Sequence, residues 1–298
     1  MPVVTLHSPA KINLFLAVVG RRPDGFHDLV SLVAPLTLGD TLTVEDQDSG
    51  DLVLTCDDPT LPVDETNLVI RAARAYQEAS GWSKGAVFRL QKRIPHGAGL
   101  GGGSSNATTT LLALNHLAGG LLSSADLLGL ATRLGSDCAL FLHGGPVVMR
   151  GRGEFIDPVS VETVGRLRGR RLWVFKPPFG IATPWAFRQL AALAPEGYMA
   201  PEEAEERLVG WMGAPSKPAE ALRFNSLERV CFEKYLALPS LVTHLRDRFG
   251  LETSMSGSGS ACFAWVPPGA GPELGQALLA TVRETWGPQA FFEEVALA

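Results

Sequence analysis

The amino-acid sequence predicts an α+β protein with two domains. Its 298 residues exceed what a single typical hydrophobic core fills. Short runs of β-branched and apolar residues, separated by turn residues, occupy much of the first half. Longer segments with helical periodicity alternate with a few strand-like runs in the second half. We therefore expect one domain at residues 1–160 and another at residues 161–298.

The first half contains the greater share of the expected strands, at residues 3–7, 11–19, 27–36, 41–46, 51–56 and 86–91. Turn residues at 22–25 and 38–40 separate neighbouring strands. Helices are expected at residues 67–80, 107–117 and 125–134. Thr66 or Asn67 would cap the first of these helices, and Gly135 would end the last.

The second half combines expected strands at residues 172–176, 261–266 and 290–295 with helices at 184–193, 201–211, 225–235, 240–249 and 272–286. The arginine-rich stretch 165–171 is interpreted as a surface loop near the domain boundary. The sequence contains no internal repeat and no low-complexity tract.

Composition and charge exclude several classes of protein. Apolar residues make up 46% of the chain and the net charge is −5, which argues against a general nucleic-acid binder. An anionic ligand would therefore need local positive charge, for which the candidates are Lys11, Arg21, Arg22, Lys92 and Arg93. No apolar run is long enough to cross a membrane, and the first residues lack the pattern of a signal peptide.

The four cysteines, at positions 56, 138, 231 and 262, are scattered along the chain. They form no Cys-x-x-Cys motif and have no neighbouring histidine pair, so neither a disulfide framework nor a zinc site is expected. Reduced thiols fit a soluble protein of the cytoplasm.

The stretch Pro-His-Gly-Ala-Gly-Leu-Gly-Gly-Gly-Ser-Ser-Asn at residues 95–106 is the most informative part of the sequence. Glycines let successive backbone N–H groups converge on one point, because no Cβ blocks the approach. The start of the helix that follows adds unpaired N–H groups and the positive end of its dipole. This combination predicts a site for a polyphosphate.

Three other interpretations of this loop are weaker. The spacing Gly97-x-Gly99-x-x-Gly102 fits a dinucleotide fingerprint, but no acidic residue follows at the required distance. Gly103 stands where a P-loop needs lysine. A plain flexible turn rarely needs so many glycines. A third kind of phosphate loop is favoured.

Other candidate segments are ambiguous when each is taken alone. Lys11 and Asn13 are two residues apart on an expected strand and so share one face, which could simply face solvent. Asp137 follows a helix end, where an isolated aspartate is by default a turn residue or a cap. Phe26 and His27 could be a core ring and a surface imidazole, and residues 256–260 an ordinary turn.

The order of these segments changes their interpretation. Pro-Ala-Lys-Ile-Asn-Leu at 9–14, the glycine-rich loop and Ser-Met-Ser-Gly-Ser-Gly-Ser at 254–260 resemble the three motifs of the GHMP kinase superfamily. Further similarities at 22–27, 65–73, 134–137, 151–154, 183–184 and 225–228 extend over nearly the whole chain. Within the superfamily, the segments at 9–13 and 24–27 resemble members that phosphorylate a cytidyl diphosphate sugar alcohol for isoprenoid synthesis.

The resemblance implies a nucleotide-binding N-terminal domain like domain 2 of ribosomal protein S5, and a C-terminal α/β sandwich domain. It implies transfer of the γ-phosphoryl group of ATP to a hydroxyl, with Mg²⁺. Asp137 would be the general base and Lys11 would stabilise the developing charge. A monomer or a weak homodimer is expected, with no nucleic-acid or membrane partner.

The remaining site residues follow from the same resemblance. Asn13 would hold the substrate hydroxyls, Phe26 and Phe187 would enclose the cytosine ring, His27 would read its edge, and Thr183 would also contact the substrate. The residues that would bind ATP are Asn67, Leu68, Pro95, Gly97, Ala98, Gly99, Leu100, Gly101, Gly102, Gly103, Ser104, Ser105, Gly257, Ser258 and Gly259. Ser104 or Ser105 would lie near the magnesium.

Three residues depart from the pattern of those members. Phe26 replaces a usual tyrosine and keeps a π face for stacking, and Ala139 stands where proline is common. His96 occupies a position where small or apolar residues are common, and solvent exposure is expected for it.

Alternative functions differ in what they require. A mevalonate or homoserine kinase would have no use for Phe26, His27 and Phe187, since its substrate lacks cytosine. A decarboxylase on this scaffold is disfavoured by the combination of Lys11 and Asp137. A silent nucleotide-binding module would be expected to lose one of these two residues.

Overall fold

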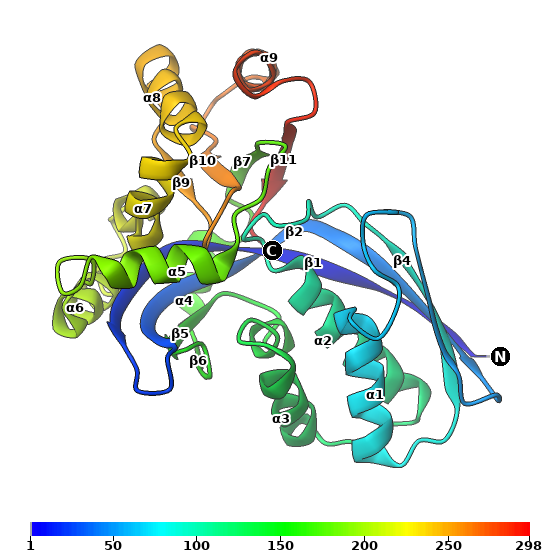
Figure 1. Ribbon diagram of the computed structural model, residues 1–298. Coiled ribbons are helices and arrows are strands. Elements are labelled where there is room, and N and C mark those ends of the chain that lie inside the picture. Colours follow the sequence, from blue (N-terminus) through cyan, green and yellow to red (C-terminus); the bar gives the residue numbers. More distant parts are fainter. Residues whose placement is uncertain (1) are drawn as a thin grey trace. The chain divides into compact units, whose positions relative to one another are not determined.

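The computed structural model describes residues 2–298, which form two compact units (Figure 1). Unit 1 contains residues 2–10, Leu38–Ile94 and Gly101–Gly144. Unit 2 contains Lys11–Thr37, Pro95–Leu100 and Gly145–Ala298. Each unit mixes helices with strands, which confirms the α+β prediction.

Unit 1 packs helices beside an extended sheet. Its elements are β3 (Leu52–Cys56), α1 (Leu68–Ser80), β4 (Gly85–Gln91), α2 (Gly102–Leu117), α3 (Ser124–Leu134) and the 3₁₀ turn η1 (Ala139–Leu142), together with parts of β1 (Val3–Arg21) and β2 (His27–Gln47). β4 pairs antiparallel with β2 and parallel with β3. The helices α1, α2 and α3 lie side by side (Figure 1). Tyr76, Phe88 and Leu111 are fully buried in this unit, as expected for an apolar helix face packed on a sheet.

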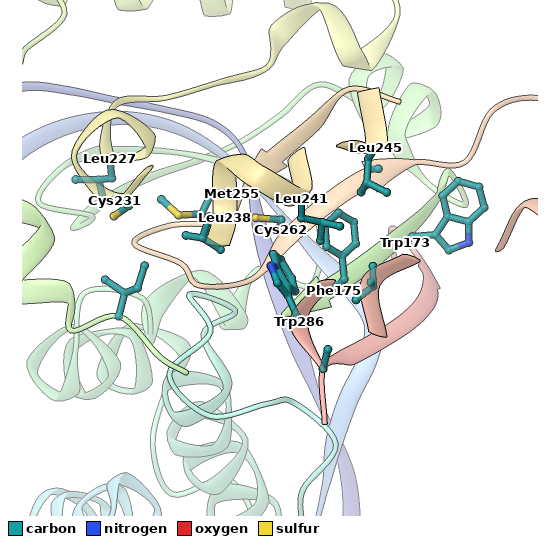
Figure 2. Close-up of a cluster of buried hydrophobic side chains, with 14 of the residues drawn as sticks. Trp173, Phe175, Leu227, Cys231, Leu238, Leu241, Leu245, Met255, Cys262 and Trp286 are labelled. Carbon is teal, nitrogen blue, oxygen red and sulfur yellow. The ribbon is translucent and has the colours of Figure 1, made fainter. Parts of the chain in front are cut away.

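Unit 2 is built around an antiparallel sheet with strand order β11-β7-β10-β9. Its elements, besides parts of β1 and β2, are β5 (Val147–Gly151), β6 (Phe155–Pro158), α4 (Val161–Leu167), β7 (Arg171–Lys176), α5 (Thr183–Ala192), α6 (Pro201–Met212), η2 (Ala219–Leu222), β8 (Phe224–Asn225), α7 (Ser226–Lys234), α8 (Ala237–Phe249), β9 (Thr253–Met255), β10 (Cys262–Trp265), α9 (Pro272–Trp286) and β11 (Phe291–Ala296). Figure 2 shows the side chains of the sheet, among them Phe175 and Cys262, meeting Leu238, Leu241 and Trp286 from the helices.

The expected turn at residues 38–40 is wrong, because this segment continues the single strand β2. Gly39 permits close contact with the adjacent strand β1, since a Cβ there would lie 2.7 Å from the Ser8 carbonyl oxygen. The Asp40 side chain is fully buried and accepts hydrogen bonds from the backbone of Arg93 and Ile94. Glycine and aspartate, typical turn residues, here serve packing and a buried ion pair.

The expected strands at 3–7 and 11–19 also join, forming the long strand β1. The expected surface loop at 165–171 overlaps α4, whose last residue Leu167 is fully buried. Ser160 caps α4 by accepting a hydrogen bond from the Thr163 backbone N–H. None of the helices formed by residues 2–298 combines the length and apolar character needed to span a membrane.

Candidate active site

Lys11 and Asn13 lie on β1 in unit 2, and both side chains are buried. The Lys11 Nζ donates to Asn13 Oδ1 at 2.7 Å, and Asn13 Nδ2 donates to Ser31 Oγ at 2.9 Å. This confirms that the two residues share one face of a strand, and it excludes the interpretation in which that face meets solvent. A buried lysine held in one position is a typical arrangement for a functional cation.

The loop that precedes β10 lies directly against Lys11 and Asn13. Ser256 Oγ accepts from the Asn13 backbone N–H at 3.3 Å and donates to the Gly99 carbonyl oxygen at 3.0 Å. Gly257 has φ +56°, and a Cβ there would lie 3.4 Å from both Asn13 Oδ1 and Lys11 Nζ. The first and third motifs of the sequence therefore meet in unit 2.

The first part of the glycine-rich loop, Pro95–Leu100, belongs to the same group. The Lys11 N–H donates to the Leu100 carbonyl, and the Ala261 N–H donates to the Ala98 carbonyl. Gly99 has φ +73°, and a Cβ there would lie 2.1 Å from the Ser256 carbonyl oxygen, so no other residue fits. Gly97 also has a positive φ, of +62°.

Thr183 and Ser258 add a hydroxyl pair to unit 2. Thr183 is the first residue of α5, and its Oγ1 lies 2.7 Å from Ser258 Oγ. Gly259, with φ +77°, has no room for a side chain because a Cβ would lie 2.5 Å from Met255 Sδ. Backbone and hydroxyl groups, rather than charged side chains, form this part of the loop.

Rings gather around His27 at the start of β2. The centroids of the His27 and Phe187 rings are 5.0 Å apart, and the Tyr198 ring is 5.9 Å from His27. Burial, followed by the charge of Arg21, lowers the pKa of His27 and so favours the neutral imidazole. Phe26 is 51% exposed, and its ring contacts the Arg152 guanidinium at 5.1 Å.

The second part of the glycine-rich loop forms the beginning of α2 in unit 1. This helix starts at Gly102, five residues before the expected start at 107, after Gly101 at φ +71°. The N–H groups of Gly102, Gly103 and Ser104 therefore belong to the first helical turn, where helical hydrogen bonds leave backbone donors unused. Gly102 and Gly103 form the N-terminus of α2, because the left-handed conformation of Gly101 ends the loop there.

The two serines of the loop have different surroundings. Ser105 is fully buried, and its Oγ accepts a hydrogen bond from Ser8 Oγ at 2.8 Å. Ser104 is partly exposed and lies near the turn at Gly135, 3.9 Å from the position of a Cβ there. Burial raises the pKa of the Cys138 thiol to about 11, while a hydrogen bond with Ser104 opposes the shift.

Asp137 lies in the turn between α3 and η1, half-buried, in the same unit as Ser104. The Cys138 N–H donates to the Gly135 carbonyl, and Thr108 Oγ1 on α2 donates to the Cys138 carbonyl at 2.7 Å. This second bond ties the turn to α2, the helix that begins within the glycine-rich loop. Ala139, where proline is common, is buried and begins η1.

The remaining expected nucleotide residues, Asn67 and Leu68, stand at the start of α1. Asn67 caps the helix by accepting a hydrogen bond from the Val69 N–H at 2.9 Å, which confirms one of the two expected caps. A Cβ on Gly103 would lie 3.5 Å from Leu68 Cδ1, so this side chain adjoins the start of α2. His96 is exposed, as expected.

Two of the cations proposed for an anionic ligand are engaged in ion pairs. Lys92 pairs with Asp40 and also donates to Asn106 Oδ1. Arg22 pairs with Asp24, Asp28 and Glu154. These partners balance their charges, so neither side chain is the free local charge that the sequence suggested.

Tyr198 and Arg152 contact expected site residues but were not among them. Tyr198 follows α5 in a loop without a recognisable motif. Arg152 lies between β5 and β6, which the sequence analysis did not predict. The Gly-x-Gly-Glu pattern at 151–154 is the one signal that could have drawn attention to this hairpin.

Comparisons with known proteins agree with these motifs. Residues 67–145 match the family model described as GHMP kinases N terminal domain. The crystal structure of the Methanococcus jannaschii mevalonate kinase aligns with a TM-score of 0.74 at 13% identity, over 100% of this chain and 99% of that chain. The fold is that of a GHMP kinase.

Closer relatives identify the branch of that superfamily. The 4-diphosphocytidyl-2-C-methyl-D-erythritol kinase of Protochlamydia amoebophila (strain UWE25) is 39% identical over 87% of this chain and 83% of its own length. A crystal structure of 4-(cytidine 5'-diphospho)-2C-methyl-D-erythritol kinase aligns with a TM-score of 0.76 at 36% identity, covering 99% of this chain and 100% of that one. The chain belongs to the 4-diphosphocytidyl-2-C-methyl-D-erythritol kinase family.

Proposed function

We propose that this protein transfers the γ-phosphoryl group of ATP to the 2-hydroxyl of 4-diphosphocytidyl-2-C-methyl-D-erythritol, a step in isoprenoid precursor synthesis. The observation that carries this proposal is the identity of 39% to a relative of that name over most of both chains. The presence of Lys11, Asn13 and Asp137 in the matching motifs supports it.

In the proposed reaction, the oxygen of the substrate hydroxyl attacks the γ-phosphorus, and Asp137 accepts the proton of that hydroxyl. The bond from the γ-phosphorus to the bridging oxygen of ADP breaks, and ADP leaves with the electron pair. Lys11 stabilises the charge that develops on the transferred group, and its hydrogen bond with Asn13 restricts the ammonium to one orientation. Most of the rate enhancement comes from this positioning and electrostatic stabilisation.

The proposed cytidyl subsite comprises Phe26, His27, Phe187 and Thr183. A neutral imidazole can both donate and accept a hydrogen bond, which suits the edge of a cytosine. The lowered pKa of His27 supports that protonation state. Phe26 and Phe187 offer ring faces, and the exposure of Phe26 leaves its ring accessible to a base.

The proposed ATP site uses the backbone of the glycine-rich loop, with Asn67 and Leu68 against the nucleoside and Gly257, Ser258 and Gly259 bordering the phosphates. Positive φ at Gly97, Gly99, Gly101, Gly257 and Gly259 supports a role of backbone N–H groups in binding. The N-terminus of α2 adds the positive end of a helix dipole.

Magnesium fits the donors of this loop. Mg²⁺ in nucleotide sites takes few protein oxygens and is held mainly by phosphates and water. Residues 2–298 contain no cluster of three histidine, cysteine or acidic side chains, so an all-protein cage is not what this chain offers. The partly exposed Ser104 hydroxyl suits the ion better than Ser105, whose hydroxyl is buried against Ser8. Bound there, magnesium would neutralise phosphate charge.

A cytoplasmic location accompanies this proposal. Cys56, Cys138, Cys231 and Cys262 are free thiols, as expected in a reducing compartment. A small-molecule substrate is consistent with the relatives named above, and a monomer or a weak homodimer remains a prediction.

The test is ADP release from ATP and magnesium with three acceptors: the cytidyl substrate, mevalonate and homoserine. Turnover with the cytidyl substrate alone is expected, because the rivals would leave Phe26, His27 and Phe187 unused. Turnover with a rival would retain a GHMP kinase but reject the cytidyl subsite. ATP binding without any turnover would favour a silent nucleotide-binding module.

A further inference from the structure

Asn225 has no role in the proposed mechanism, but it lies where strand β1, helix α7 and the loop after β9 meet in unit 2. It is buried, with 5% of its surface exposed. It forms the end of β8, which pairs in parallel with β1 so that Leu16 lies opposite Asn225. It also caps α7, because its Oδ1 accepts from the Leu227 N–H at 2.9 Å. Next to it, Ser226 Oγ accepts from the Val18 N–H of β1.

The other end of the Asn225 amide holds the loop that follows β9. Its Nδ2 donates to the carbonyl oxygens of Met255 and Gly257, both at 2.8 Å. Both N–H bonds of the amide are used in this way, so the side chain is fully committed. Glu228, one turn further along α7, accepts from the Met255 N–H at 2.7 Å. Figure 2 shows Met255 of β9 and Cys231 of α7 in the same buried cluster.

The loop held in this way is the one that contacts Lys11. A Cβ on Gly257 would lie 3.4 Å from Lys11 Nζ and Asn13 Oδ1, and Ser256 bridges Asn13 to Gly99. Asn225 thus connects strand β1, which contains Lys11, with the loop that borders Lys11. A cap alone needs only the oxygen of the amide, and serine or aspartate would supply it. The two N–H donors of the amide are not needed for the cap, and they hold the loop at Met255 and Gly257.

We propose that Asn225 is a positioning residue: its side-chain amide fixes the Met255–Gly257 backbone so that Gly257 and Ser256 keep Lys11, Asn13 and Gly99 in register for phosphoryl transfer. This inference rests on the proposed function and assigns it a residue whose side-chain bonds go to Met255, Gly257 and Leu227. Without the amide donors, the loop retains its sequence but loses two of the bonds that set its distance from β1.

The test compares Asn225→Ser and Asn225→Asp with Asn225→Ala and the control Ser160→Ala. Serine and aspartate keep an acceptor for the Leu227 N–H but remove the amide NH₂ group that donates to both carbonyls, while alanine removes the cap as well. Ser160→Ala removes the cap of α4, whose bonds join Ser160 to Thr163 and involve no residue of the loop. Wild-type ADP release with the cytidyl substrate is measured first, so failure of the proposed function is recognised separately.

With an active wild type, kcat should fall on the order of 10-fold or more in Asn225→Ser and Asn225→Asp, the scale expected for two lost hydrogen bonds. Ser160→Ala should keep the wild-type kcat although its Tm falls. Asn225→Ala should show both the lower kcat and the lower Tm. All assays are run below the unfolding temperature of each variant. A kcat within about twofold of wild type in a folded Asn225→Ser or Asn225→Asp would reduce Asn225 to a helix cap and overturn the proposal.

Discussion

Lys11 in unit 2 and Lys92 in unit 1 are both largely shielded from solvent but have different surroundings. Lys92 in unit 1 pairs with Asp40, whose carboxylate also accepts from the backbone of Arg93 and Ile94 and from Asn106 Nδ2. Lys11 in unit 2 donates to the neutral side chain of Asn13 and lies beside Gly257.

The surroundings of each lysine distinguish the structural role of Lys92 from the catalytic role proposed for Lys11. Around Lys92, four protein donors bind the Asp40 carboxylate. These bonds join the end of β4 to β2 and α2. Around Lys11, the contacts include Asn13 and the third motif, where a Cβ on Gly257 (φ +56°) would lie 3.4 Å from Lys11 Nζ. Charge in the sequence does not distinguish the two lysines, whereas the motif residues Asn13 and Gly257 beside Lys11 do.

The largest expected effect belongs to Asp137→Asn. This change removes the proton acceptor but keeps the shape of a half-buried side chain. We expect kcat to fall by about 10²–10⁴ with little change in Tm, because a positioned general base contributes on that scale. Steady-state ADP release and thermal unfolding measure the two quantities. Turnover at the wild-type rate would remove Asp137 from the mechanism.

Glu228→Gln tests the acidic neighbour of the loop beside Lys11. Burial raises the pKa of Glu228 from 4.5 to about 7, against the opposing effects of the Met255 N–H and Arg223. A raised carboxyl pKa means that folding favours the protonated form. Its stabilising contribution is therefore complete below pH 4.5 and lost as the pH rises through about 7.

Between about pH 5 and about pH 8, the wild-type free energy of unfolding should fall relative to that of Glu228→Gln by up to roughly 3 kcal/mol. The neighbouring thiols do not titrate in this window, because burial raises the pKa of Cys231 to about 12 and that of Cys262 well above its usual value. Urea unfolding at several pH values measures the difference. Parallel pH curves for the two proteins would show that Glu228 is ionised throughout.

Ser104→Ala and Ser105→Ala should give the smallest effects. The first should change the magnesium requirement, and the second should change the stability. Removing the Ser104 hydroxyl should raise the magnesium concentration for half-maximal turnover by about fivefold, the equivalent of one hydrogen bond, with Tm unchanged. Removing the Ser105 hydroxyl should cost about 1 kcal/mol of stability by leaving Ser8 without this partner, with the magnesium requirement unchanged. The reverse pattern would assign the metal to Ser105.

The sequence predicted those parts of the site in which local chemistry determines the structure. The glycine-rich loop, the shared face of Lys11 and Asn13 and the cap at Asn67 follow from backbone freedom, strand periodicity and helix ends. The strand through Gly39 and Asp40 was taken for a turn, because a buried ion pair with Lys92 is a long-range contact with no local signal. The short strand β8 was missed because its two residues pair with the distant strand β1, and β9 was missed because it has only three residues.

The roles of the site residues and the division of the chain near residue 160 stay predictions. Tyr198 approaches His27 from a loop whose sequence gives no indication of the contact. The choice between Ser104 and Ser105 also required the structure, because only burial against Ser8 distinguishes two adjacent serines.

The most direct test of this comparison measures kcat and Tm for Lys11→Met and Lys92→Met in parallel, at a temperature where both variants are folded. For Lys11→Met we expect kcat to fall about 10²–10³-fold with a small change in Tm, as for loss of a preorganised charge. Lys92→Met should leave Asp40 buried without its cation and cost about 3–5 kcal/mol of stability, while kcat per folded molecule stays near the wild-type value. A catalytic defect in Lys92→Met with normal turnover in Lys11→Met would contradict the assignment of the two lysines.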